Sequence, residues 1–115
     1  MLRSNSTIST SASTNGNGGN ITITAPVIVA FPSNNDITAN AFSGNGGQVT
    51  IYTQGLFGIA PLSRAELERR LNTTAPSQLD PSRLPTSDIT AISQQSPSLN
   101  GTLHREIYDW LNIER

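Results

Sequence analysis

Two copies of one short pattern decide how this chain folds: Gly16-Asn17-Gly18-Gly19-Asn20-Ile21-Thr22-Ile23 and, 28 positions later, Gly44-Asn45-Gly46-Gly47-Gln48-Val49-Thr50-Ile51. In each copy a glycine-rich turn leads into a segment in which β-branched aliphatic residues alternate with threonine. Alternation with period 2 predicts a strand with one buried face, made by Ile21 and Ile23 or by Val49 and Ile51. The glycines are predicted to allow positive φ at the corner before each strand.

A second strand type, in which an isoleucine is followed by Thr or Ser and then by Ala or Thr, is predicted at three places. Its copies centre on Ile8, Ile37 and Ile89, with spacings of 29 and 52 positions. The two patterns alternate, so one turn of a coil is predicted to run from about Ile8 to Ile37. Stacking such turns aligns like side chains, and this predicts an all-β solenoid. The apolar run at residues 25–32 is predicted to be a strand covered on both faces or capped by a neighbouring loop.

An insertion interrupts the rungs at residues 56–86. Ser63-Arg64-Ala65-Glu66 matches a capping box, in which the Ser hydroxyl binds the N3 amide and Glu66 reaches back. Glu66 with Arg70 and Leu67 with Leu71 form i,i+4 pairs. A short helix is therefore predicted at residues 64–71. Residues 73–86 contain three prolines and are predicted to form an extended loop without a helix.

The chain accordingly divides into three parts. Residues 1–14 are predicted to be a frayed N-terminal strand in a low-complexity segment, and residues 15–103 to form the rungs with their insertion. Asn100-Gly101 stands as a degraded third copy of the glycine corner. Residues 104–115 form a divergent tail that is charged and aromatic, and the tail is predicted to be a short helix with Ile107, Tyr108 and Leu111 on one face.

Composition limits the possible functions. The chain has 115 residues, 13% of them charged, a formal net charge of −1 and no Cys. The charged fraction is about half the usual ~25%, which is typical neither of a compact enzyme nor of a charged disordered chain. The basic residues are scattered arginines, so nucleic-acid binding is not predicted. A disulfide framework, a thiolate metal site, a membrane span and a signal peptide are not predicted either.

Asp36 and Asp88 occupy equivalent places before their strands. Stacked on neighbouring rungs, they could form a carboxylate pair for acid/base work, as in β-helix polysaccharide hydrolases. Alternatively, each is a turn cap that begins a strand. The capping interpretation is favoured, because no third acid or base accompanies the pair.

No other residue supports a catalytic, cofactor-binding or metal-binding site, and no cofactor is predicted. His104 is the only His, and a triad or metal site around it has no support. The Gly-Asn-Gly-Gly turns lack the Asp and the nine-residue period of calcium-binding repeats. Tyr108 with Trp110 could stack on a sugar, but packing of an amphipathic tail explains them better.

Several stretches of the sequence, in their order and in their spacing, resemble the C-terminal part of cyanobacterial filamentous-haemagglutinin-like exoproteins of two-partner secretion systems. The resemblance covers roughly residues 15–103. It is carried by Gly18-Gly19-Asn20-Ile21-Thr22-Ile23, Asn35-Asp36-Ile37-Thr38-Ala39-Asn40-Ala41-Phe42, Gly46-Gly47-Gln48-Val49-Thr50-Ile51, Gln54-Gly55-Leu56-Phe57-Gly58-Ile59, Leu84-Pro85-Thr86-Ser87-Asp88-Ile89-Thr90-Ala91 and Asn100-Gly101-Thr102-Leu103.

The resemblance implies a right-handed parallel β-helix, present here as a fragment of about three rungs. It also implies secretion across the outer membrane by a partner barrel and a location outside the cell or on the outer-membrane surface. The implied partners are the parent solenoid's rungs or another chain at the open ends, the outer-membrane secretion partner and surface polysaccharide. The secretion domain of such proteins is not found in this sequence, and the pattern is lost from His104 onward.

The predicted function is therefore that of a non-catalytic fragment of an adhesin-like exoprotein that binds through its solenoid faces. The side chains expected to be most exposed for this role are Thr22, Thr38, Thr50 and Thr90. Two alternatives stay open. One is a fragment of a β-helix polysaccharide lyase or hydrolase, which needs a charged cleft across the rungs. The other is a non-functional gene remnant that does not fold alone.

Overall fold

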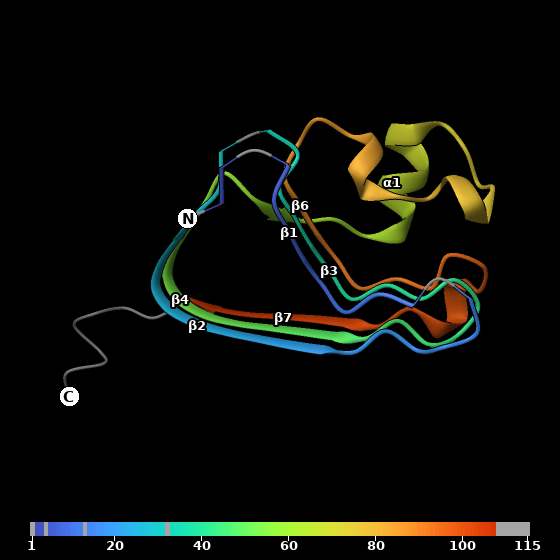
Figure 1. Ribbon diagram of the computed structural model, residues 1–115, viewed down its shortest axis with the longest axis horizontal. Coiled ribbons are helices and arrows are strands. Elements are labelled where there is room, and N and C mark those ends of the chain that lie inside the picture. The colour runs from blue at the N-terminus through green and yellow to red at the C-terminus, as the bar shows by residue number, and fades with distance from the viewer. Residues whose placement is uncertain (1, 4, 13, 32, 108–115) are drawn as a thin grey trace.

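The fold consists of parallel strands stacked in successive coils (Figure 1). The computed structural model describes residues 2–3, 5–12, 14–31 and 33–107. In this part of the chain there are two sheets, and every pairing in them is parallel. The first sheet has the order β1 (Thr7–Ser9), β3 (Asp36–Thr38), β6 (Asp88–Thr90), β5 (Ala60–Pro61); the second has β2 (Asn20–Val29), β4 (Gln48–Phe57), β7 (Thr102–Ile107). The arrangement is a β-solenoid-like one with a single short α-helix, as the sequence predicts.

The strand register confirms the repeat spacing. Ile8 pairs with Ile37, and Ile37 pairs with Ile89. In the second sheet, Ile21 pairs with Val49, which in turn pairs with Leu103. Both patterns therefore stack as the sequence predicts, and the degraded corner at Asn100-Gly101 does lead into a third strand.

The rungs are defined by these pairings. Strands β1 and β2 make the first rung, β3 and β4 the second, and β6 and β7 the third. Strand β5 lies next to β6 on the side away from β3, one level beyond the third rung. The chain thus passes beyond the third rung to make β5 before it returns to make β6.

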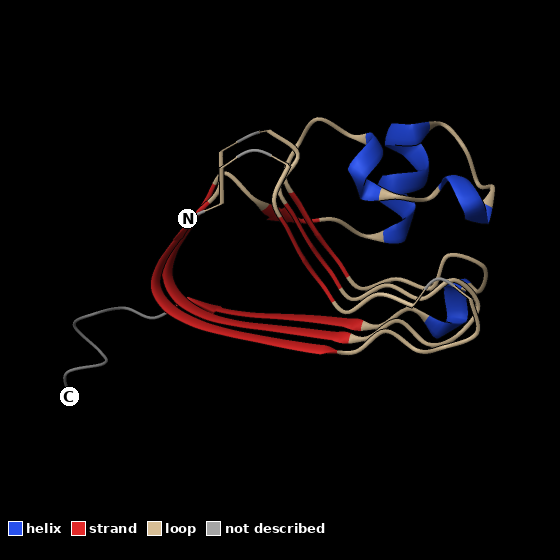
Figure 2. Ribbon diagram, viewed as in Figure 1, coloured by secondary structure: helices blue, strands red, loops and turns tan. Residues whose placement is uncertain are grey.

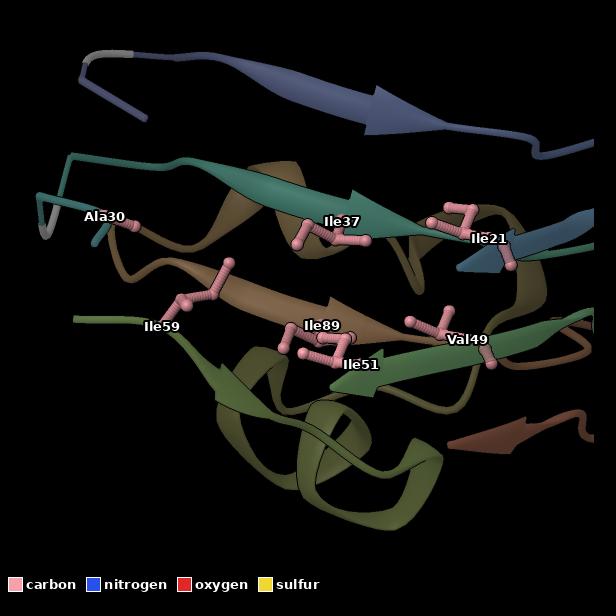
Figure 3. Close-up of a cluster of buried hydrophobic side chains, with 9 residues drawn as sticks. Ile21, Ala30, Ile37, Val49, Ile51, Ile59 and Ile89 are labelled. Carbon is pink, nitrogen blue, oxygen red and sulfur yellow. The ribbon is translucent and has the colours of Figure 1, made fainter. Parts of the chain in front are cut away.

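The core lies between the two sheets (Figure 3). Its buried members are aliphatic side chains from the inward-facing positions of the strands and corners: Ile21, Ala30, Ile37, Ala39, Val49, Ile51, Ile59, Ile89 and Ala91. Each large side chain among them contributes roughly 1.5–3 kcal/mol by its removal from water. Ile8 on the first rung is still 39% exposed, so the core is densest at the second and third rungs.

The corner glycines are needed for close approach of the backbone, and the predicted positive φ is wrong. Of the glycines in the chain, only Gly58 has a positive φ, 80°. A Cβ on Gly47 would meet the carbonyl oxygen of Gly19, and a Cβ on Gly101 would meet that of Gly47. The corners of successive rungs therefore pack backbone against backbone, which no side chain permits.

The sequence predicts that the run at residues 25–32 is covered on both faces or capped by a neighbouring loop, and this prediction is wrong. Its first half belongs to β2, a ten-residue strand that continues through Pro26. Val27 is 53% exposed and Phe31 is 46% exposed. No layer of the described chain packs on the outside of the second sheet, so only the inward residues of this run are covered. Pro26 is tolerated because β2 is an edge strand.

The insertion forms the α-helix α1 (Arg64–Leu71), as predicted, followed by the 3₁₀ turns η1 (Pro76–Gln78) and η2 (Pro81–Arg83). The turns correct the prediction of an extended loop, because proline at the first position favours a helical turn. A second apolar cluster joins the insertion to Ile92 of the third rung and consists of Leu62, Leu67, Leu79 and Ile92, with Leu71 and Leu84 beside them. The insertion thus packs against the outer side of the first sheet (Figure 2).

The described part of the tail is a strand, so the predicted helix is wrong there. After the 3₁₀ turn η3 (Pro97–Leu99), β7 runs through position 104 to Ile107 and pairs with β4 as far as Thr53. Pairing with a preformed strand outweighs the weak helical pattern of these residues. Tyr108, Trp110 and Leu111 lie outside the described residues.

Candidate functional site

The outer face of the second sheet is the most continuous uncovered polar surface that the strands offer. It is formed by the side chains that alternate with the inward aliphatic residues. We call it the open face, and its described members are Asn20, Thr22, Thr24, Gln48, Thr50, Tyr52, Thr102 and His104. In rows across the rungs, Asn20 stacks on Gln48 and Thr102, and Thr22 stacks on Thr50 and His104. Thr50 and Tyr52 are half-buried and the other members are exposed.

The outer face of the first sheet is not available in the same way. Thr38 and Thr90 alternate with the inward Ile37 and Ile89 and so point outward, where exposure was predicted. They are only 8% and 0% exposed. The insertion lies on this side of the first sheet (Figure 2), and its Leu79 and Asp80 line the same pocket as Thr38. The prediction of exposure is therefore confirmed for Thr22, partly confirmed for Thr50, and wrong for Thr38 and Thr90.

Tyr52 was missed as a surface residue, although the sequence carried a signal for it. It follows Thr50 by two positions, and the alternation of the strand places it on the same face. Its ring meets the ring of His104 in an edge-on arrangement, with 6.4 Å between the ring centroids and 67° between the planes. The open face therefore combines rows of hydroxyl and amide groups with one aromatic pair.

Asp36 and Asp88 come together on neighbouring rungs, as their equivalent positions predict. The backbone N–H of Asp88 donates to Oδ1 of Asp36 over 3.0 Å. The two residues are 2% and 3% exposed. A carboxylate that accepts a backbone amide from the next rung links two coils, whereas the sequence favours a cap of each residue's own turn.

Burial raises the pKa of Asp36 to about 6; the amide hydrogen bond from Asp88 opposes this, and the charges of Asp88 and Asp80 add to it. Burial also raises the pKa of Asp88, opposed by the Thr86 hydroxyl, which donates to its carboxylate, and by the Arg70 guanidinium. Both carboxyls thus lie in an environment that disfavours their charged forms.

A groove lies at the end of the solenoid next to the third rung. It measures about 230 Å³, and it is lined mainly by apolar residues of the insertion arm and of the third rung, including Pro61, Leu62, Ala91, Ile92 and Leu103. The buried guanidinium of Arg64 fixes the arm at this place. Its Nε donates to the carbonyl of Ser93 over 3.1 Å, and its Nη2 donates to that of Gln94 over 2.8 Å.

Other kinds of site find no support in the described residues. Within residues 2–3, 5–12, 14–31 and 33–107, no group of three or more His, Cys, Asp or Glu could hold a metal ion. In the same part of the chain, no helix has the length and apolar character needed to cross a membrane. His104 lies on the surface of β7 beside Tyr52.

Comparisons with models of protein families, with curated proteins and with solved structures found no match to this chain.

Proposed function

We propose that this chain is a slice of a right-handed parallel β-helix from a secreted, adhesin-like exoprotein, and that it binds surface polysaccharide without catalysis. The proposed parent resembles the filamentous-haemagglutinin-like proteins of two-partner secretion. It would act outside the cell or on the outer-membrane surface after export through an outer-membrane partner.

The observation that carries this proposal is the open face. Three rungs present hydroxyl and amide groups in straight rows, about 4.8 Å apart from strand to strand. Such rows can hydrogen-bond to the hydroxyl groups of a sugar chain at several points. The insertion covers the other sheet and leaves this face free. Many weak contacts of this kind add up when a polymer touches several rungs at once.

The polarity of the open face suggests which polysaccharides it fits. None of its described members is an Asp, Glu, Lys or Arg. We therefore propose neutral polymers as ligands, and binding should change little with ionic strength, unlike binding that depends on exposed charges. The enzyme alternative has less support, because Asp36 and Asp88 are buried and their carboxyls accept hydrogen bonds within the fold.

Binding of the full chain to immobilised neutral glucans and galactans tests the proposal, with a sulfated galactan for comparison. The double variant Thr22→Val with Thr50→Val keeps the shape and β-propensity of both side chains but removes two hydroxyl groups from one row. It should weaken binding to the neutral polymers at least fivefold. Thr74→Val, at an exposed position of the insertion, is the matched control and should bind as the unchanged chain does.

Preference for the sulfated polymer, or equal binding by the double variant and the control, would contradict a role for the open face. Polysaccharide cleavage that is lost in Asp36→Asn would instead support the enzyme alternative.

A further inference from the structure

We infer that the end of the solenoid at β7 is a receptor for one added β-strand, whose sequence has the chain's own repeat pattern of two glycines followed by alternating polar and aliphatic residues. The inference rests on the solenoid arrangement proposed above and is independent of adhesion. Its three supports are the free edge of β7, the apolar groove beside it and the glycine corner at Gly101.

The backbone of β7 can accept another parallel strand. β7 is the last strand of the second sheet in the described chain. The N–H of Thr102 donates to the carbonyl of Gly47, toward β4. Because successive residues of a strand direct their backbone groups to opposite sides, the N–H and C=O of Leu103 face the free edge. Strand edges of this kind bind extended peptides by β-augmentation.

The groove supplies a place for the side chains of such a strand. Leu103 packs against the core from its edge, and the groove beside it has about 230 Å³ of space. The arm with β5 lies one level beyond the third rung and forms the opposite wall with Pro61 and Leu62. The two hydrogen bonds of Arg64 to the third rung hold this wall in place, so the site is largely formed before a strand arrives.

The corner decides which strands fit. At each step of the stack, a glycine packs against the backbone of the glycine below it: Gly47 on Gly19, then Gly101 on Gly47. A strand that continues the stack needs a glycine opposite Gly101 and, two positions later, an aliphatic residue opposite Leu103. Residues 43–55 meet both requirements, with Gly47 in the first place and Val49 in the second.

A complete second copy of the chain does not fit this end. If the β2 of a stacked copy paired with the β7 of this chain, the β1 of the copy would have to pair with β6 of this chain in the first sheet. That position is already filled by β5. The vacancy is therefore one strand wide and lies only in the second sheet, and the occupant is a single extended segment of a partner chain.

A peptide with the sequence of residues 43–55 tests the inference against the full chain. In the register of the stack, the N–H groups of Gln48 and Thr50 in the peptide would face β7, since the amide of Gln48 in the chain faces the preceding rung. Those of Val49 and Ile51 would face away. N-methylation at Thr50 should weaken binding at least tenfold. N-methylation at Val49, the matched control, should change it less than about threefold. All changes are in the peptide, so the protein's folding is not affected.

Chemical-shift changes should centre on residues 101–104 and on Leu62. Equal effects of the two methyl groups, shift changes at β1 and β2 instead, or no binding up to the peptide's solubility limit would each overturn the inference. A concentration-dependent dimer that the peptide displaces would show that the occupant is a second copy, and this too would overturn it.

Discussion

Gly47 permits the close approach of successive coils because it has no side chain. Its Cα lies so close to the carbonyl of Gly19 that even a methyl group would collide with that oxygen. The sequence shows that glycines recur at the corners but not the reason for it, since both a left-handed turn and a close approach select glycine. Only the stacked geometry separates these two explanations.

Replacement of Gly47 by Ala should destabilise the fold by about 2 kcal/mol or more, because backbone of two rungs must shift to admit the Cβ. Gly16→Ala is the matched control, since its Cβ would meet only the Cβ of Ala12, at 3.2 Å. That change should cost less than about 1 kcal/mol. Denaturant melts followed by circular dichroism give both values, and similar losses in the two variants would contradict close approach as the role of Gly47.

Asp36 should make the fold less stable at neutral than at acidic pH. Burial raises the pKa of its carboxyl to about 6 from 3.8, so between these values the folded chain binds more protons than the unfolded one. Its contribution is complete below pH 3.8 and is lost as the pH rises through about 6. The loss is at most about 3 kcal/mol at 1.36 kcal/mol per pKa unit.

Asp36→Asn keeps the acceptor for the Asp88 amide and removes the titration. The variant should melt at a higher temperature than the unchanged chain at pH 7 and at nearly the same temperature at pH 4. Asp88, whose pKa is also raised, leaves part of the pH dependence in place. Asp80→Asn removes only a smaller electrostatic effect on Asp36 and serves as the control. A variant that is less stable at pH 7 would show that the carboxylate form is the stabilising one.

Among the elements, the strands follow from the sequence more closely than the insertion does. Alternation and spacing predict the paired segments of β1, β2, β3, β4 and β6 and their register, because each depends on contacts with a copy of itself. The helix α1 is also predicted, and Ser63 does cap it by accepting from the Glu66 amide over 3.2 Å. The Glu66 carboxylate binds Arg69 instead of reaching back to Ser63.

What the sequence does not predict at this scale depends on contacts between unlike segments. Nothing in residues 62–86 indicates that they cover Thr38 and Thr90, and nothing in Ala60 and Pro61 indicates a strand beyond the third rung. The open face follows only in part from the sequence, for the same reason. Alternation assigns side chains to one face of a sheet, but packing decides whether that face is covered.

Arg64 should be the residue that holds the insertion on the third rung. Arg64→Met keeps most of the buried volume but removes the charged hydrogen bonds to Ser93 and Gln94, each worth about 1.5–3 kcal/mol. The insertion should open more often, and trypsin should cleave after Arg69 or Arg70 at least tenfold faster. Arg70→Met is the control for loss of an arginine, although it removes one cleavage site. Unchanged cleavage after Arg69 in Arg64→Met would contradict this role.

The whole molecule is elongated, with extents of 47 × 25 × 20 Å. Its core is a row of short ladders, and each rung depends on its neighbours, as in solenoid proteins. Stability should therefore differ between the rungs. The second rung is paired on both sides, whereas the first rung is paired on one side and carries an isoleucine that is 39% exposed.

Hydrogen exchange of the full chain should show this gradient. Amides of β3 and β4 should exchange most slowly, at least a hundredfold more slowly than those of β1, because an end rung opens without the others. A cooperative β-type melt should accompany it. Uniformly fast exchange together with a coil spectrum would support the alternative of a remnant that does not fold alone.

The position of β5 beyond β6 has a consequence for the order in which the chain is made. A polypeptide that emerges from its N-terminus completes β5 while the edge of β3 is still vacant, and β6 does not yet exist. In that interval β5 is the nearest strand that can occupy the edge. The native order is reached only when β6 enters between them. Synthesis that pauses after residue 86 gives β5 time to pair with that edge before β6 is made, so the pace of synthesis should affect how often this segment assembles correctly at the first attempt.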